Sequence, residues 1–197
     1  MENRLSKPLA SEIANSAASS ALRGAGVVLA GSALVAVCSH IAVPLWFTPV
    51  PLTLQPFAVL LLGLILSPRL AAATLGAYLL EGAAGLPVFA PGFVLGAGMT
   101  HLLGPTGGYL MSYPAATMLV SWLRRRLSRG YAGAVLSSAA GNGVILLCGF
   151  AWLAIWTHAH FGSAFALAVL PFLPGDALKV VAAAGIVTGW DRVRRKQ

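Results

Sequence analysis

The sequence predicts an all-α integral membrane protein that crosses the bilayer six times and keeps both chain ends in the cytoplasm. Three observations lead to this prediction. Only 9% of the 197 residues are charged, where a soluble domain has about 25%, and 58% are hydrophobic. The hydrophobic residues fall into separate runs, and basic residues cluster beside these runs. A soluble protein of this composition would have too little polar surface to cover itself.

Six apolar runs are candidates for membrane helices, which need about 20 residues each. They lie at residues 24–46, 54–66, 70–85, 107–123, 131–156 and 176–190. The second and third are short, and Pro171 and Pro174 break the chain before the last. We therefore predict an N-terminal tail at 1–22, a six-helix membrane domain at 23–191 and a basic tail at 192–197.

The distribution of basic residues predicts the orientation. If the N-terminus is cytoplasmic, every Lys and Arg except Lys179 lies on the inner side, which is twelve of the thirteen. An odd number of spans would place one basic chain end on the outer side, against the usual bias. The net charge of +8 therefore indicates contact with anionic lipid headgroups rather than with nucleic acid.

The three outer connections have a different composition. The first, at 43–56, contains four prolines, the second, at 86–105, is rich in glycine, and the third lies near 157–163. Non-helical backbone at membrane depth must be buried in protein or line a cavity, so we predict a pocket open to the outside. Four histidines fall on this side, either as interfacial residues or as ligand or proton-relay groups. They are His40, His101, His158 and His160.

Three charged residues lie inside the apolar runs, namely Glu81, Asp176 and Lys179. Each costs about 2.5–3.5 kcal/mol near the bilayer centre, so each is a functional candidate. Asp176 and Lys179 are three residues apart and share a helix face. Asp176 follows Pro174 and Gly175, a pattern typical of a helix start. The pair is either a structural tether or the polar floor of a small-ligand site in the outer half of the membrane.

Two amides and two thiols also lie within the runs. Gln55 lies between prolines and either faces the cavity or caps a helix. Asn142 lies at mid-depth of the fifth run, where it must bond another helix or a ligand. Cys38 and Cys148 have no metal-ligand spacing, and we expect both to be small buried hydrophobic residues.

Motifs for energy conversion and hydrolysis are absent from the sequence. It contains no phosphate-binding G-x-x-x-x-G-K-[ST], no H-E-x-x-H and no G-x-S-x-G. We therefore expect no enzymatic activity and no resident cofactor or metal. A transport role would depend on an ion gradient or on a partner ATPase.

Four motifs in the same order resemble the BioY family, the biotin-specific substrate-binding (S) components of energy-coupling-factor (ECF) transporters. They are VPLTLQ at 50–55, GLPVF at 85–89, GPTGGY at 104–109 and PGDALK at 174–179. The resemblance extends from about residue 24 to 190. It implies an S-component bundle of six helices in the bacterial cytoplasmic membrane, with a biotin site near the outer face. It also implies a complex with a transmembrane coupling subunit and two ATPase subunits.

The resemblance also implies site residues, with biotin as the transported ligand. Gln55, Tyr109, Asp176 and Lys179 are the expected polar contacts, accompanied by Thr53 and Asn142. The sulfur ring and aliphatic tail would contact Phe89, Leu86 and Trp46. Some family members have an Arg where this chain has Leu110, which leaves Lys179, Tyr109 or loop N–H groups for the carboxylate.

Some residues of this chain depart from the family pattern or have an open role. Glu81 and Pro91 stand where an apolar residue and a glycine are expected. The small residues Gly26, Ala30, Ala33 and Ala36 offer a face on the first helix for the coupling subunit or for ordinary packing.

Two other functions remain open from the sequence. One is an S component for a different small vitamin, because a fold does not fix its substrate. The other is a proton-coupled transporter or membrane enzyme that uses Glu81, Asp176 and the histidines.

Overall fold

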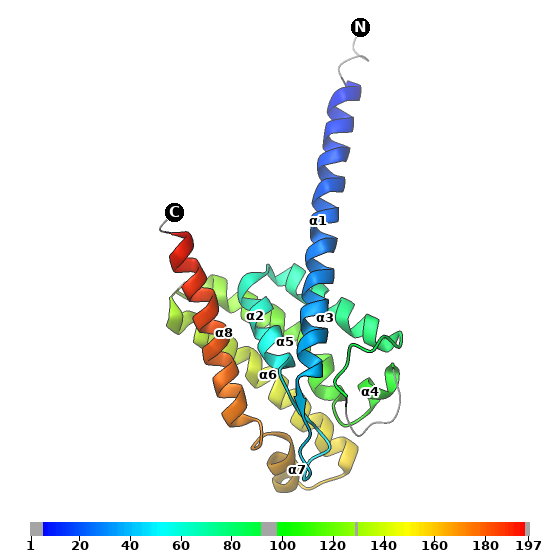
Figure 1. Ribbon diagram of the computed structural model, residues 1–197, viewed down its shortest axis with the longest axis vertical. Coiled ribbons are helices and arrows are strands. Elements are labelled where there is room, and N and C mark those ends of the chain that lie inside the picture. The colour runs from blue at the N-terminus through cyan, green and yellow to red at the C-terminus, as the bar shows by residue number, and fades with distance from the viewer. Residues whose placement is uncertain (1–5, 92–97, 129, 196–197) are drawn as a thin grey trace.

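The computed structural model describes residues 6–91, 98–128 and 130–195, and side chains from residue 18 onward within these ranges. The helices are α1 (Ser6–His40), α2 (Gln55–Ile65), α3 (Pro68–Ala83), α4 (Met99–Leu103), α5 (Gly107–Arg126), α6 (Tyr131–Thr157), α7 (Phe161–Ala168) and α8 (Leu173–Arg194). Two short strands, β1 (Ala42–Val43) and β2 (Leu52–Thr53), pair antiparallel. Both chain ends lie at the same end of the bundle, opposite α7 and the hairpin (Figure 1).

The predicted helical runs correspond to α1, α2, α3, α5, α6 and α8. Both ends of the first run differ from those of α1. α1 begins at Ser6, inside the predicted tail, and continues into the bundle without a break. It ends at His40 rather than Trp46, because residues 42–43 leave the helix to pair with residues 52–53. The predicted helix over 41–46 is therefore wrong, and this segment belongs to a hairpin.

Two short helices lie in connections for which the sequence predicted only loops. α4 occupies part of the glycine-rich connection, and α7 begins within the connection after α6. α6 ends at Thr157, and the capping residue His158 that follows has a left-handed backbone with φ of 52°. α7 and α8 are bent relative to each other by 46°.

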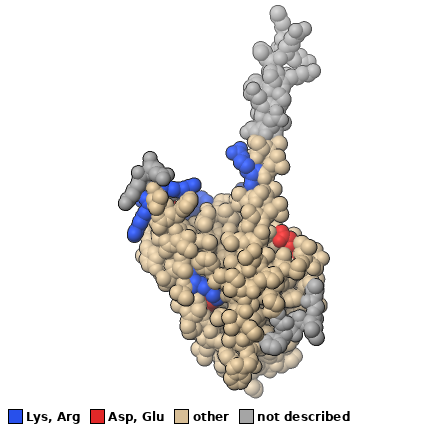
Figure 2. Space-filling view, viewed as in Figure 1, with Lys and Arg blue, Asp and Glu red and all other residues tan. Residues whose placement is uncertain are grey.

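Length and composition alone identify fewer membrane spans than the six predicted. Within the described residues, Ala18–His40 and Tyr131–Thr157 are long and apolar enough to cross a bilayer. The bent pair α7–α8 would make a third, and α2 is a shorter apolar helix. Large hydrophobic side chains are exposed around the bundle, as lipid contact requires, and Lys and Arg lie mainly at the end that holds both termini (Figure 2).

The bundle is built around the close packing of α5 against α6. Small residues allow this approach: a Cβ at Gly108 would overlap Trp152, and one at Gly141 would overlap Val120. α3 packs on α5 and on α1, while α8 packs on α2 and α6. The result is a ring of helices with its buried aromatic residues toward the hairpin end.

Polar contacts connect the helices at two further places. Ser32 of α1 donates to the Glu81 carboxylate of α3 at 2.9 Å, so Glu81 joins these two helices. The buried Arg124 guanidinium pairs with Asp191 of α8 at 3.1 Å and also donates to the carbonyls of Ser128 and Gly130. This second contact fixes the α5–α6 connection to the C-terminal end of α8.

The two cysteines differ in environment. Cys38 is buried, as predicted, whereas Cys148 is exposed on the outer face of α6. The prediction that Cys148 is buried is therefore wrong. A helix that is apolar all round gives no pattern from which its inward face can be read.

Candidate functional site

A cavity lies between the hairpin and the helices near it. With its open mouth it takes in about 700 Å³ of space between the protein atoms, part of which is open solvent. Its wall comes from the hairpin, the start of α2, residues 89–90, α4 and its C-terminal connection, α5, α6, Phe172 and α8. The wall is mostly apolar and carries a few polar groups, as ligand sites do.

An ion pair in the first turn of α8 provides the charged part of the cavity wall. The Lys179 ammonium donates to one Asp176 oxygen at 2.9 Å, and the Asn142 amide of α6 donates to the other at 3.2 Å. Asp176 and Lys179 are 3% and 8% exposed, so both charges are out of bulk solvent. The ammonium and the positive end of the α8 dipole stabilise the buried carboxylate.

This cluster retains hydrogen-bonding capacity for a ligand. An ammonium has three donors, and one contacts Asp176. The Asn142 carbonyl oxygen is buried and has no partner in the described part of the chain. The pair ties α8 to α6 through Asn142 and also faces the cavity, so its position is compatible with both roles left open by the sequence.

Gln55 lines the cavity, but its amide already has partners. Its oxygen accepts from Thr53 at 3.1 Å, and its nitrogen donates to the Tyr78 hydroxyl. Tyr78 in turn donates to the Val88 carbonyl at 2.9 Å. The side chain does not cap α2, which contradicts that reading of its position. Gln55 thus fixes α3 and residue 88 relative to the hairpin, and Thr53 lines the cavity beside it.

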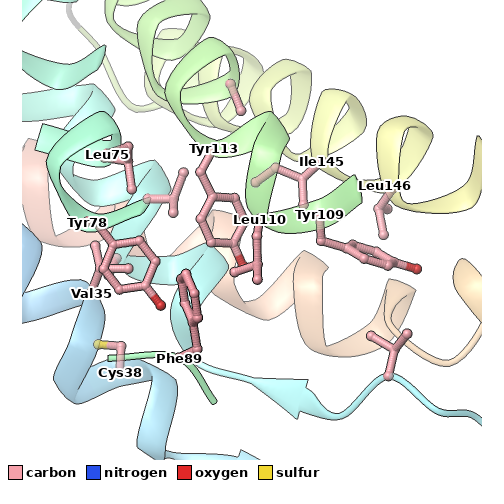
Figure 3. Close-up of a cluster of buried hydrophobic side chains, with 14 of the residues drawn as sticks. Val35, Cys38, Leu75, Tyr78, Phe89, Tyr109, Leu110, Tyr113, Ile145 and Leu146 are labelled. Carbon is pink, nitrogen blue, oxygen red and sulfur yellow. The ribbon is translucent and has the colours of Figure 1, made fainter. Parts of the chain in front are cut away.

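Tyr109 contributes its ring rather than its hydroxyl. The hydroxyl donates to the Ala168 carbonyl at 2.7 Å, and the ring lies 6.0 Å from that of Phe172 between centroids. Phe89 lies on the same wall, 5.5 Å from Tyr78 in an edge-to-face arrangement (Figure 3). These rings provide a large apolar surface on the cavity wall.

Three of the residues proposed from the sequence do not line the cavity. Trp46 is 93% exposed and packs edge-on against Phe47 in the turn of the hairpin, because α1 ends before it. Leu86 is 53% exposed. Asn142 supports the wall from behind by holding Asp176.

The cavity also has wall residues that the sequence did not single out. Tyr113 follows Tyr109 by four residues and lies on the same face of α5, a spacing that could have identified it. Val50, Ile145, Leu146 and Phe172 carry no sequence signal beyond being apolar. His101 was one of four histidines with an open role, and it alone of them lines the cavity.

Comparison with known proteins places the chain in a family. Residues 10–196 match the family model described as BioY family. The chain is 44% identical over 151 residues to the probable biotin transporter BioY of Pyrococcus horikoshii, covering 77% of this chain and 85% of that protein. It is 36% identical over 153 residues to the biotin transporter BioY of Thermotoga maritima, covering 78% and 86%.

A solved structure has the same fold. The chain superposes with a TM-score of 0.78 on the crystal structure of the S-component for biotin from an ECF-type ABC transporter. The match covers 91% of this chain and 94% of that one at 24% identity, which supports the likeness of fold. On the extent of the family match and the identity to its relatives, this chain belongs to the BioY family.

Proposed function

We propose that this chain binds biotin in the cavity and serves biotin uptake as the S component of an ECF transporter. The observation that carries the proposal is the buried ion pair of Asp176 and Lys179 on a mostly apolar cavity wall, with Asn142 holding Asp176. Relatives named biotin transporter BioY and the fold shared with an S-component for biotin support this assignment.

The chemistry of the wall suits a biotin ring. The ureido group has two N–H donors and one carbonyl acceptor. Asp176 accepts an N–H, and Lys179 donates to the carbonyl with the protons that do not contact Asp176. The sulfur ring lies against Phe89, Tyr109 and Phe172. Asn142 keeps the Asp176 carboxylate in position.

We further propose six membrane crossings, by α1, α2, α3, α5, α6 and α8, with both ends in the cytoplasm of a bacterial cell. The shared location of the chain ends and of most basic residues supports an even number of crossings (Figures 1 and 2). The chain acts as a transporter subunit rather than an enzyme, and a transmembrane coupling subunit and two ATPase subunits supply ATP hydrolysis.

The purified chain in detergent is expected to bind radiolabelled biotin with nanomolar affinity. Unlabelled biotin should displace the label, while an excess of thiamine, riboflavin or lipoate should not. Displacement by another vitamin at lower concentration than biotin would instead favour an S component for that vitamin. The absence of biotin binding by intact, monodisperse protein would overturn the proposal.

The membrane orientation is tested with single cysteines. In a chain carrying Cys38→Ala and Cys148→Ala, His160→Cys should react with an impermeant maleimide in spheroplasts, because residue 160 is exposed on the α7 side. Arg195→Cys, exposed at the other end, should react only after permeabilisation. Equal labelling of both positions in sealed spheroplasts would contradict an arrangement with the C-terminus inside.

A further inference from the structure

Two of the polar parts of the cavity wall lie apart from each other. Asp176 and Lys179 belong to α8, which packs on α2 and α6, whereas His101 belongs to α4, which packs on α3 and α5. α4 and α8 lie on opposite sides of the bundle (Figure 1). A ligand held by its ring at α8 therefore has a second polar contact available across the cavity.

The His101 ring has an unused nitrogen. Its Nδ1 is buried and makes no hydrogen bond to any residue of the described chain. The ring lies 5.6 Å from that of Phe89 between centroids, and the His101 carbonyl accepts from Thr106 at 3.3 Å. Backbone and ring are thus both held, while Nδ1 retains the capacity for one hydrogen bond. A buried polar atom without a partner is costly, so Nδ1 requires water or a ligand.

Several other polar groups of the cavity wall are already engaged. Gln55 bonds Thr53 and Tyr78, and the Tyr109 hydroxyl donates to Ala168. The Thr106 hydroxyl donates to the His101 carbonyl. Among the described wall residues away from α8, the His101 Nδ1 on α4 and the Tyr113 hydroxyl on α5 therefore remain without a hydrogen bond within the described chain.

We propose that His101 recognises the carboxylate of the biotin side chain, with its Nδ1–H donating to a carboxylate oxygen while Phe89 packs against the ring. The inference rests on the proposed function, because a ring system at Asp176 and Lys179 leaves the acyl tail to extend toward α4. It assigns the carboxylate to a residue outside the four motifs that carry the family resemblance.

The test compares biotin with biotinamide, whose neutral amide replaces the carboxylate, on the full chain in detergent. His101→Phe keeps an aromatic ring beside Phe89 and removes the nitrogen. We expect this variant to lower the affinity for biotin about 10- to 100-fold, as for the loss of a hydrogen bond to a charged group, and the affinity for biotinamide no more than about threefold. His101→Asn returns an N–H near the Nδ1 position and should recover most of the preference for the acid.

Controls separate this inference from the proposed function. His160→Phe makes the same change at an exposed histidine outside the cavity and should leave both affinities unchanged. If His101→Phe does not fold, His101→Ala gives the same readout. Equal weakening of acid and amide, or no preference for the acid in the parent chain, would overturn the role of His101 alone. A parent chain that binds neither compound would overturn both proposals.

Discussion

The Asp176→Asn variant is expected to lose biotin binding and about 3–5 kcal/mol of stability, the usual cost of leaving a buried charge without its partner. Asp176 accepts from both Lys179 and Asn142, and Lys179 is 8% exposed. An asparagine has one carbonyl oxygen and no charge, so the ammonium would remain in the protein interior uncompensated. Thermal unfolding in detergent and radiolabelled biotin binding measure the two effects.

A second variant separates stability from recognition. Asp176→Asn combined with Lys179→Met removes both charges and should regain most of the stability while binding stays lost. Asp191→Asn removes a carboxylate of the same helix from the ion pair with Arg124, where the Asp191 side chain is 39% exposed. That change should cost less stability than Asp176→Asn, because the Arg124 guanidinium keeps its bonds to the Ser128 and Gly130 carbonyls, and it should leave biotin affinity intact. Near-normal biotin binding by Asp176→Asn would show that the Asp176 carboxylate is not needed for binding.

The Gly149→Ala variant is expected to lose about 1–3 kcal/mol of stability by overpacking, together with most of its biotin affinity. An added Cβ on α6 would overlap the Tyr109 ring. The ring cannot yield freely, because its hydroxyl is bonded to Ala168 and its face lies against Phe172. Since the same ring lines the cavity, any movement that relieves the clash also changes the cavity wall.

The matched control lies on the same helix. A Cβ at Gly143 would meet no atom within 4 Å, so Gly143→Ala should remain within about 1 kcal/mol of the parent and bind biotin normally. Thermal unfolding and biotin titration of the two variants in the same detergent make the comparison. Equal behaviour of the two alanine variants would show that Tyr109 has room to move.

Most helices were predictable from the sequence because particular residue types mark where they begin and end. The run at 131–156 follows a basic cluster, and the structure places α6 at Tyr131–Thr157. The end of α1 was misplaced because residues 41–46 are apolar, which suits a membrane helix and a short strand equally. Pairing of Ala42 with Thr53 decides between them, and that contact joins residues separated by a proline-rich loop.

The candidate site was predictable where its geometry is local. Asp176 and Lys179 are one helical turn apart, so their contact follows from the sequence. Asn142 reaches Asp176 from another helix, and the partner of the Tyr109 hydroxyl is the Ala168 carbonyl, 59 residues away. No residue type in the sequence indicates such contacts between distant segments. Trp46 shows the converse, since an aromatic residue near a motif gives no information on the direction of its side chain.

The ion pair on α8 has an electrical consequence for uptake. The charges of Asp176 and Lys179 cancel, so the described wall of the cavity carries no net charge when His101 is neutral. A monoanionic ligand then loads the cavity with one negative charge. Moving one charge through 100 mV involves about 2.3 kcal/mol, and an inside-negative potential opposes the entry of an anion. Delivery of the acid without a proton is therefore electrogenic, whereas delivery of its neutral amide is not.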